Sequence, residues 1–207
     1  PECMDMDLLR HHFSLLSKGE PIMVPKFEFA RQMRMSHMGT HLRLGKNEVA
    51  IFEGIHALND DIAGRHPEAT KLYISARSNV NEGATLRFKG TWMRLTRRCV
   101  RDFNFRGTDV GETLEMWANV RRGEKLYISP YKNRADVIFD SSLPYEVSVM
   151  KNFALPLFSA VPESNPRHDE LVELSRAFEH FEAIDPELVP RNSLLREFIG
   201  GGSYQYH

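Results

Sequence analysis

A run of closely spaced arginines between residues 92 and 109, WMRLTRRCVRDFNFRGTD, constrains the fold of this chain more than any other stretch. Drawn as a helix, arginines at i, i+3, i+4 and i+7 share one face: Arg94, Arg97, Arg98 and Arg101. Apolar residues spaced by three and four lie on the opposite side, as a core requires: Trp92, Leu95, Cys99 and Phe103. Because like charges on one helix face repel each other, the stripe predicts either an anionic ligand among the arginines or a solvated basic face paired with nearby acids.

Capping signals mark the end of this helix and the start of the next. Gly107 stands where a C-cap residue is expected, and Asp109 with Glu112 resembles a capping box. The second helix is expected to span about residues 110–127. The sequence therefore predicts two consecutive helices joined by a short turn.

Short apolar stretches predict strands around these helices. Residues 48–52 are expected to form a buried parallel strand, because an apolar run follows a polar turn there. Residues 71–75 and 135–139 predict two more strands, and residues 79–89 predict a loop. Strands that alternate with helices indicate an α/β fold built on a parallel sheet.

Further helices are expected towards both ends of the chain. Amphipathic patterns and caps predict them at residues 4–16, 142–161, 168–181 and 194–199. Residues 22–29 are expected to be extended, because Pro21 and Pro25 exclude a helix interior.

Composition excludes several classes of protein. The chain has 207 residues, of which 42% are hydrophobic, enough to bury a core. A net charge of -1 argues against a protein whose whole surface binds nucleic acid. Cys3 and Cys99 lie far apart in the sequence, which indicates reduced thiols and a cytoplasmic protein. No apolar run approaches the roughly 18 residues that a membrane span needs.

The arginine helix resembles a known family. RLTRRCVRDFNFRG is similar to the lid helix of the uridine kinases, which belong with the phosphoribulokinase-like P-loop kinases. VPKFEF and EVAIFEGIHAL agree with that family in order and spacing. Downstream, RRGEKLYISPYKNRADVIFDSSLPYE and NSLLREFIGGGSYQY resemble a bacterial branch of nucleoside or uridine kinase-like proteins. The resemblance implies an enzyme that binds ATP, Mg²⁺ and a nucleoside.

The resemblance also implies a domain organisation. No G-x-x-x-x-G-K-[ST] loop occurs in the chain. We therefore expect an N-terminally truncated P-loop NTPase core, with the phosphate-binding loop and the catalytic carboxylate upstream of Pro1. Residues 1–141 would form the C-terminal part of the kinase domain, with its lid at about 87–130, and residues 142–207 a helical annex. Such a fragment is expected to be inactive alone, and the sequence leaves room for a homo-oligomer.

The resemblance assigns phosphate chemistry to the lid. Arg98, Arg101 and Arg106 match lid arginines that reach the ATP phosphates or the acceptor, Arg101 and Arg106 on the ATP side. Positioned guanidiniums stabilise the charge that phosphoryl transfer spreads over the phosphate oxygens. Glu53 matches a carboxylate that holds a water molecule on Mg²⁺, although it could instead cap a following helix.

The acceptor site implied by the resemblance lies upstream. Phe27, Glu28, Gln32 and Arg34 match positions that hold the base and sugar of the nucleoside. Several positions depart from the well-known uridine enzymes: Phe27 replaces Tyr, Gln32 replaces His, Thr108 replaces a lid Arg and Met116 replaces a base-reading Gln. These departures leave the identity of the nucleoside open, and Phe27 could equally be a core residue.

Other functions stay open at the level of sequence. A kinase of the same superfamily could act on a sugar or a vitamin-like alcohol. A nucleic-acid-binding module could use the arginine stripe, but the balanced charge and the lack of interleaved aromatics argue against nucleic acid. A kinase relic that only binds a partner is the third alternative.

Overall fold

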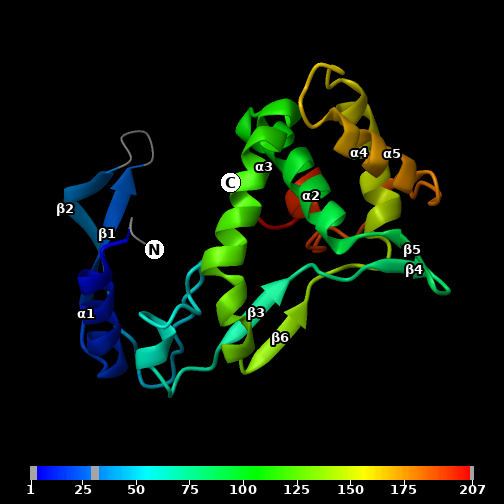
Figure 1. The fold of residues 1–207 in the computed structure, drawn as a ribbon. Coiled ribbons are helices and arrows are strands. Elements are labelled where there is room, and N and C mark those ends of the chain that lie inside the picture. The colour runs from blue at the N-terminus through cyan, green and yellow to red at the C-terminus, as the bar shows by residue number, and fades with distance from the viewer. Residues whose placement is uncertain (1–3, 29–32, 206–207) are drawn as a thin grey trace. The chain divides into compact units, whose positions relative to one another are not determined.

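The computed structural model describes residues 4–28 and 33–205 (Figure 1). The chain divides into two compact units, the first made of residues up to 71 with 127–135, the second of residues 72–126 with 136–207. Among the helices that the structure describes, none is both long and apolar enough to cross a bilayer.

The first unit combines a helix with an antiparallel hairpin. Helix α1 spans Met6–Ser17, and its N-cap Asp5 accepts a hydrogen bond of 3.0 Å from the backbone N–H of Leu8. Strand β1, Ile22–Glu28, pairs antiparallel with β2, Met33–Leu42. The predictions of a helix and of an extended segment are confirmed, whereas the sequence did not predict β2. A short 3₁₀ turn, η1, follows at Ala63–Arg65.

The prediction of a buried strand at residues 48–52 is wrong. These residues form no strand, and Val49 and Ile51 are 85% and 89% exposed. An extended segment becomes a strand only when neighbouring backbone groups accept and donate its hydrogen bonds. Within the described part of the chain, no strand lies beside this segment.

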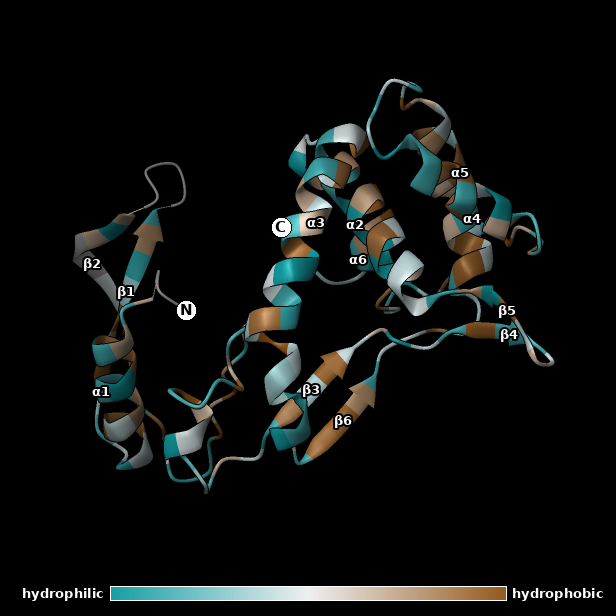
Figure 2. Ribbon diagram, in the orientation of Figure 1, coloured by the Kyte–Doolittle hydropathy of each residue, from teal (hydrophilic) through white to brown (hydrophobic). Residues whose placement is uncertain are grey.

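The second unit contains the parallel pair that the sequence predicts. Strand β3, Leu72–Ser75, pairs in parallel with β6, Val137–Asp140, with Leu72 opposite Val137. Both strands are rich in apolar residues (Figure 2), and several of these are about half exposed: Leu72, Ile74, Val137, Ile138 and Phe139. The parallel strands expected at 71–75 and 135–139 are therefore confirmed.

The prediction of a loop at residues 79–89 is also wrong. The segment forms a β-hairpin of β4, Val80–Glu82, and β5, Thr85–Phe88. Gly83 takes the positive φ of 57° that the tight turn requires. Phe88 is only 1% exposed and packs against the ring of Phe178 at a centroid distance of 4.9 Å. This long-range contact anchors the hairpin, and local sequence could not reveal it.

The arginine-rich segment forms α2, Gly90–Arg106, and α3 follows as Val110–Tyr127. Gly107 ends α2 in the left-handed conformation, with φ of 65°. The side chain of Asp109 accepts a 2.8 Å hydrogen bond from the backbone N–H of Glu112, whose carboxylate accepts one of 3.4 Å in return. Both predicted caps are thus confirmed. A 3₁₀ segment, η2, follows at Ser129–Arg134.

Three of the remaining helices share a core with α2: α4, Glu146–Ser159; α5, His168–Phe178; and α6, Arg196–Ile199. A short 3₁₀ turn, η3, Pro186–Leu188, lies between α5 and α6 and buries none of its residues. Cys99 and Val100 of α2 are fully buried in one cluster with apolar residues of these helices: Val149, Met150, Leu174, Phe178 and Phe198. The helices predicted after residue 142 are confirmed, and the boundary at 141/142 stays a prediction.

Candidate functional site

Three of the predicted lid arginines gather around one carboxylate, that of Asp102. The Nε atom of Arg98 lies 3.2 Å from Asp102 Oδ2, the Nε of Arg101 lies 3.4 Å from Oδ1, and the Nη1 of Arg106 lies 3.2 Å from Oδ1. The side chain of Asp102 is only 3% exposed, whereas that of Arg106 is 50% exposed. The three arginines therefore form one cluster, the Asp102 cluster, that reaches solvent through Arg106.

Helical geometry explains why these residues meet. Arg98 and Arg106 stand four residues before and after Asp102, so all three share one face of α2. The residues predicted from the sequence include the arginines but not Asp102. The spacing of four on either side of a single acid was the signal that could have identified it.

The Asp102 cluster carries excess positive charge. Three guanidiniums face Asp102, and one of them, that of Arg101, also has its Nη1 at 3.9 Å from Oε1 of Glu197. Burial lowers the pKa of Arg101, and the neighbouring charge of Arg106 lowers it further, although Asp102 and Glu197 oppose the shift. An anion with oxygen acceptors can relieve this repulsion.

The other arginines of the predicted stripe are paired with buried acids. The Nη1 of Arg94 lies 2.6 Å from Oε1 of Glu124, and Arg97 binds both carboxylate oxygens of Glu146, its Nη2 at 2.8 Å from Oε2. Arg97 also donates to the carbonyl of Ser141 at 3.1 Å. The stripe is therefore divided among three carboxylates, which is the alternative of paired acids that the sequence analysis kept open.

The predicted acceptor residues lie in the first unit, on the β1–β2 hairpin. Phe27 is 49% exposed and stands opposite Arg34 in the strand register, so it is not a core residue. The Nη1 of Arg34 lies 2.7 Å from Oδ2 of Asp5. Glu28 is partly buried at the end of β1. Gln32 lies outside the described residues.

Asp5 has two structural roles. It caps α1 through the N–H of Leu8 and also fixes the guanidinium of Arg34. The hydrogen bond from Leu8, followed by that from Arg34, lowers the pKa of Asp5. The carboxylate therefore stays ionised and joins the start of α1 to the predicted acceptor hairpin.

Glu53 is the predicted metal ligand. It is exposed and is followed by turns, so it does not cap a helix. In the described ranges, no three His, Cys, Asp or Glu side chains gather closely enough to hold a metal ion. Mg²⁺ often binds one or two carboxylates together with phosphates and water, so a single carboxylate such as Glu53 fits that role only beside a nucleotide.

Comparison with known proteins yields a family match. The model of the Phosphoribulokinase / Uridine kinase family matches residues 1–148. A uridine kinase of Staphylococcus epidermidis is 26% identical over 150 residues, 72% of this chain and 64% of the relative. A uridine kinase of Chloroflexus aggregans is 30% identical over 140 residues, 67% of this chain and 59% of the relative. A chloroplastic uridine/cytidine kinase of Arabidopsis thaliana is 30% identical over 139 residues, 67% of this chain and 25% of the relative. The chain thus spans about three-fifths of the length of these bacterial relatives.

Proposed function

This chain belongs to the phosphoribulokinase / uridine kinase family, and from this premise we propose that the protein transfers the γ-phosphoryl group of ATP to a hydroxyl of a uridine- or cytidine-like nucleoside. In this proposal the chain supplies lid and acceptor-site residues, and the phosphate-binding loop comes from elsewhere in the protein. Relatives named uridine kinase and uridine/cytidine kinase support the choice of a nucleoside.

The Asp102 cluster is the observation that carries the proposal. In phosphoryl transfer, negative charge spreads over the equatorial oxygens of the γ-phosphate. The excess positive charge of the cluster would stabilise that negative charge. Arg101 and Arg106 would bind ATP phosphates, and Arg98 would contact the transferred group or its acceptor. Asp102 acts as a positioning residue, because it forms ion pairs with all three arginines and accepts hydrogen bonds from Arg101 and Arg106 before the substrate arrives.

On the acceptor side, Phe27 would stack on the base, while Glu28, Gln32 and Arg34 would bind the base and sugar. Asp5 would hold Arg34 in one orientation through their 2.7 Å contact. Glu53 would hold water on Mg²⁺, which supplies positive charge to the ATP phosphates when it is bound. The exposure of Phe27 is compatible with stacking, since a buried ring could not receive a base.

The test is ADP release by the full-length protein with ATP, Mg²⁺ and a panel of nucleosides. We expect stimulation by at least one nucleoside, and a loss of roughly a hundred-fold in kcat/KM for Arg101→Ala, the size found when one transition-state donor is removed. Arg176→Ala, at an exposed position of α5, serves as the matched control and should keep full activity.

Two results would contradict the proposal. Turnover that responds only to sugars or vitamin-like alcohols would transfer the function to another acceptor class. Equal activity of Arg101→Ala and Arg176→Ala would remove the Asp102 cluster from the mechanism.

A further inference from the structure

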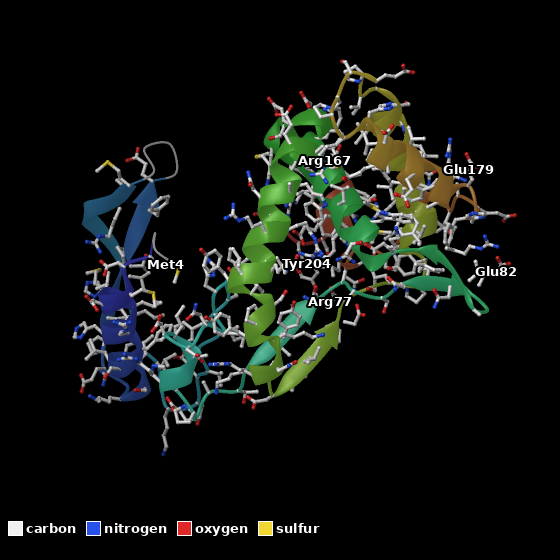
Figure 3. All side chains as sticks on the ribbon, in the orientation of Figure 1. Met4, Arg77, Glu82, Arg167, Glu179 and Tyr204 are labelled. Carbon is white, nitrogen blue, oxygen red and sulfur yellow. The ribbon has the colours of Figure 1, made fainter. Side chains whose placement is uncertain are left out.

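A second cluster of three arginines surrounds Glu124 of α3. Arg77, which lies just beyond β3 and is labelled in Figure 3, places its Nη2 3.4 Å from Oε1 of Glu124. Arg94 of α2 places its Nη1 2.6 Å from Oε1 and 2.7 Å from Oε2, and Arg121 of α3 places its Nη1 2.7 Å from Oε2. We call this set, with Glu124, the Glu124 cluster. Local sequence patterns do not predict this cluster, because its members come from three separate segments.

The Glu124 cluster is less neutralised than the Asp102 cluster. Three guanidiniums face one carboxylate, which leaves two positive charges, whereas Glu197 adds a second carboxylate near the Asp102 cluster. Burial alone would raise the pKa of Glu124, but the hydrogen bond and charge of Arg94 and the charges of Arg121 and Arg77 together lower it. Glu124 is therefore fully ionised at neutral pH and still cannot balance its partners.

The arginines also have more donors than Glu124 can accept. Three guanidiniums carry about fifteen N–H groups, against about four lone-pair positions on a carboxylate. The Nε of Arg77 is buried and has no hydrogen-bond partner among the described residues. Glu124 has a side chain only 7% exposed, while the arginines stay 26–43% exposed, so an anion from solvent can reach them.

Aromatic rings hold two of the guanidiniums in place. The Cζ of Arg77 lies 5.0 Å from the ring centre of Tyr73, and Nη2 of the same arginine donates to the Tyr73 hydroxyl. The Cζ of Arg94 lies 6.0 Å from the ring centre of Trp117. Such restrained guanidiniums lose little freedom when they bind a ligand, which favours binding over a loose surface pairing.

From this geometry we infer that the Glu124 cluster is a second anion-binding site, one that takes a dianionic phosphate group. Two uncompensated charges match a phosphate dianion, whereas a single carboxylate ligand would leave one of them unbalanced. The fork of a guanidinium also matches two phosphate oxygens at once. The inference does not depend on the proposed kinase activity, because none of its residues belongs to the Asp102 cluster or to the acceptor hairpin.

The experiment is an NMR titration of the ¹⁵N-labelled protein with inorganic phosphate, followed on the arginine Nε–Hε signals. Sodium chloride at equal ionic strength is the reference. We expect the signals of Arg77, Arg94 and Arg121 to shift saturably with phosphate and not with chloride. A parallel titration with methyl phosphate distinguishes the sources of the ligand: equal binding assigns the site to phosphate esters, and binding of inorganic phosphate alone assigns it to the free ion.

Variants separate this site from a purely structural network. The double variant Arg77→Gln/Arg121→Gln should weaken phosphate binding at least about ten-fold, measured on the remaining Arg94 signal. Arg122→Gln, at the exposed neighbouring position of α3, should leave it unchanged. Glu124→Gln should tighten binding by about ten-fold, because it removes the competing carboxylate charge.

The inference is overturned if phosphate shifts the three signals no more than chloride does, or if Glu124→Gln fails to tighten binding in a protein whose circular dichroism spectrum is unchanged. The Nε–Hε signals of Arg98, Arg101 and Arg106 are read in the same spectra. If phosphate shifts the signals of the Asp102 cluster but not those of the Glu124 cluster, the result contradicts this inference and leaves the proposed kinase function untouched.

Discussion

At the scale of single residues, the arginines of α2 pair with acids that lie at very different distances along the sequence. Asp102 is a neighbour on the same helix, whereas Glu124 is 30 residues and Glu146 is 49 residues distant from its partner on α2. Sequence spacing could therefore predict the Asp102 cluster in principle, but not the other pairs. The pair of Arg97 and Glu146 is the most buried, with side chains 10% and 2% exposed.

Glu146→Gln should destabilise the protein by about 3 kcal/mol. The substitution leaves Arg97 buried with an uncompensated charge, and losing one partner of a buried pair costs about that much. Urea unfolding followed by circular dichroism measures the change. Glu182→Gln, at an exposed position, is the control and should stay within about 0.5 kcal/mol of the parent. Equal midpoints for the two variants would mean that the pair contributes little.

At the scale of elements, the sequence predicted helices far better than strands. Capping residues and amphipathic spacing are local, so α1 to α6 and the C-terminal end of α2 could be found from the sequence alone. A strand depends on a partner strand, which local sequence does not reveal. Residues 48–52 were therefore predicted as a strand although no described strand pairs with them, and β2 and the β4–β5 hairpin were missed. The same limit applies to the arginines of α2. The sequence predicted these donors on one helix, but not the distant acceptors Glu124 and Glu146.

The start of α2 is fixed by a close backbone approach at Gly90. A Cβ atom there would lie 2.4 Å from the carbonyl oxygen of Arg77, and the N–H of Gly90 donates to Asn79 Oδ1 at 2.8 Å. Gly90→Ala should therefore cost about 1–3 kcal/mol, because backbone must move to admit the methyl group.

Gly123→Ala in α3 is the matched control for Gly90→Ala. Nothing lies within 4 Å of a Cβ atom at this position. The exchange should stabilise the helix by about 0.5–1 kcal/mol through propensity alone. Thermal unfolding of both variants gives opposite shifts in Tm if this account is right, and a shift of the same sign in both would refute it.

At the scale of the whole molecule, the helices after residue 148 support the helix that carries the Asp102 cluster. The family match ends at residue 148, yet α6 lies against α2: Asn104 Nδ2 donates to the carbonyl of Phe198 at 3.0 Å. Glu197 approaches Arg101 at 3.9 Å from the same short helix. The C-terminal segment therefore belongs to the same folded unit as α2, and we expect α2 and the C-terminal helices to unfold together.

Cys99 provides a probe of that joint unfolding. The thiol is fully buried in the core shared by α2 and α4, and burial raises its pKa to about 12. Because this raised pKa keeps the thiol protonated well above its ordinary value of 9.0, almost no thiolate forms at pH 8, and native Cys99 should resist thiol reagents there. In a Cys3→Ser background, we expect its labelling rate to rise with urea in parallel with the loss of helical circular dichroism. Labelling that saturates well before the helical signal falls would mean that α2 opens without the C-terminal helices.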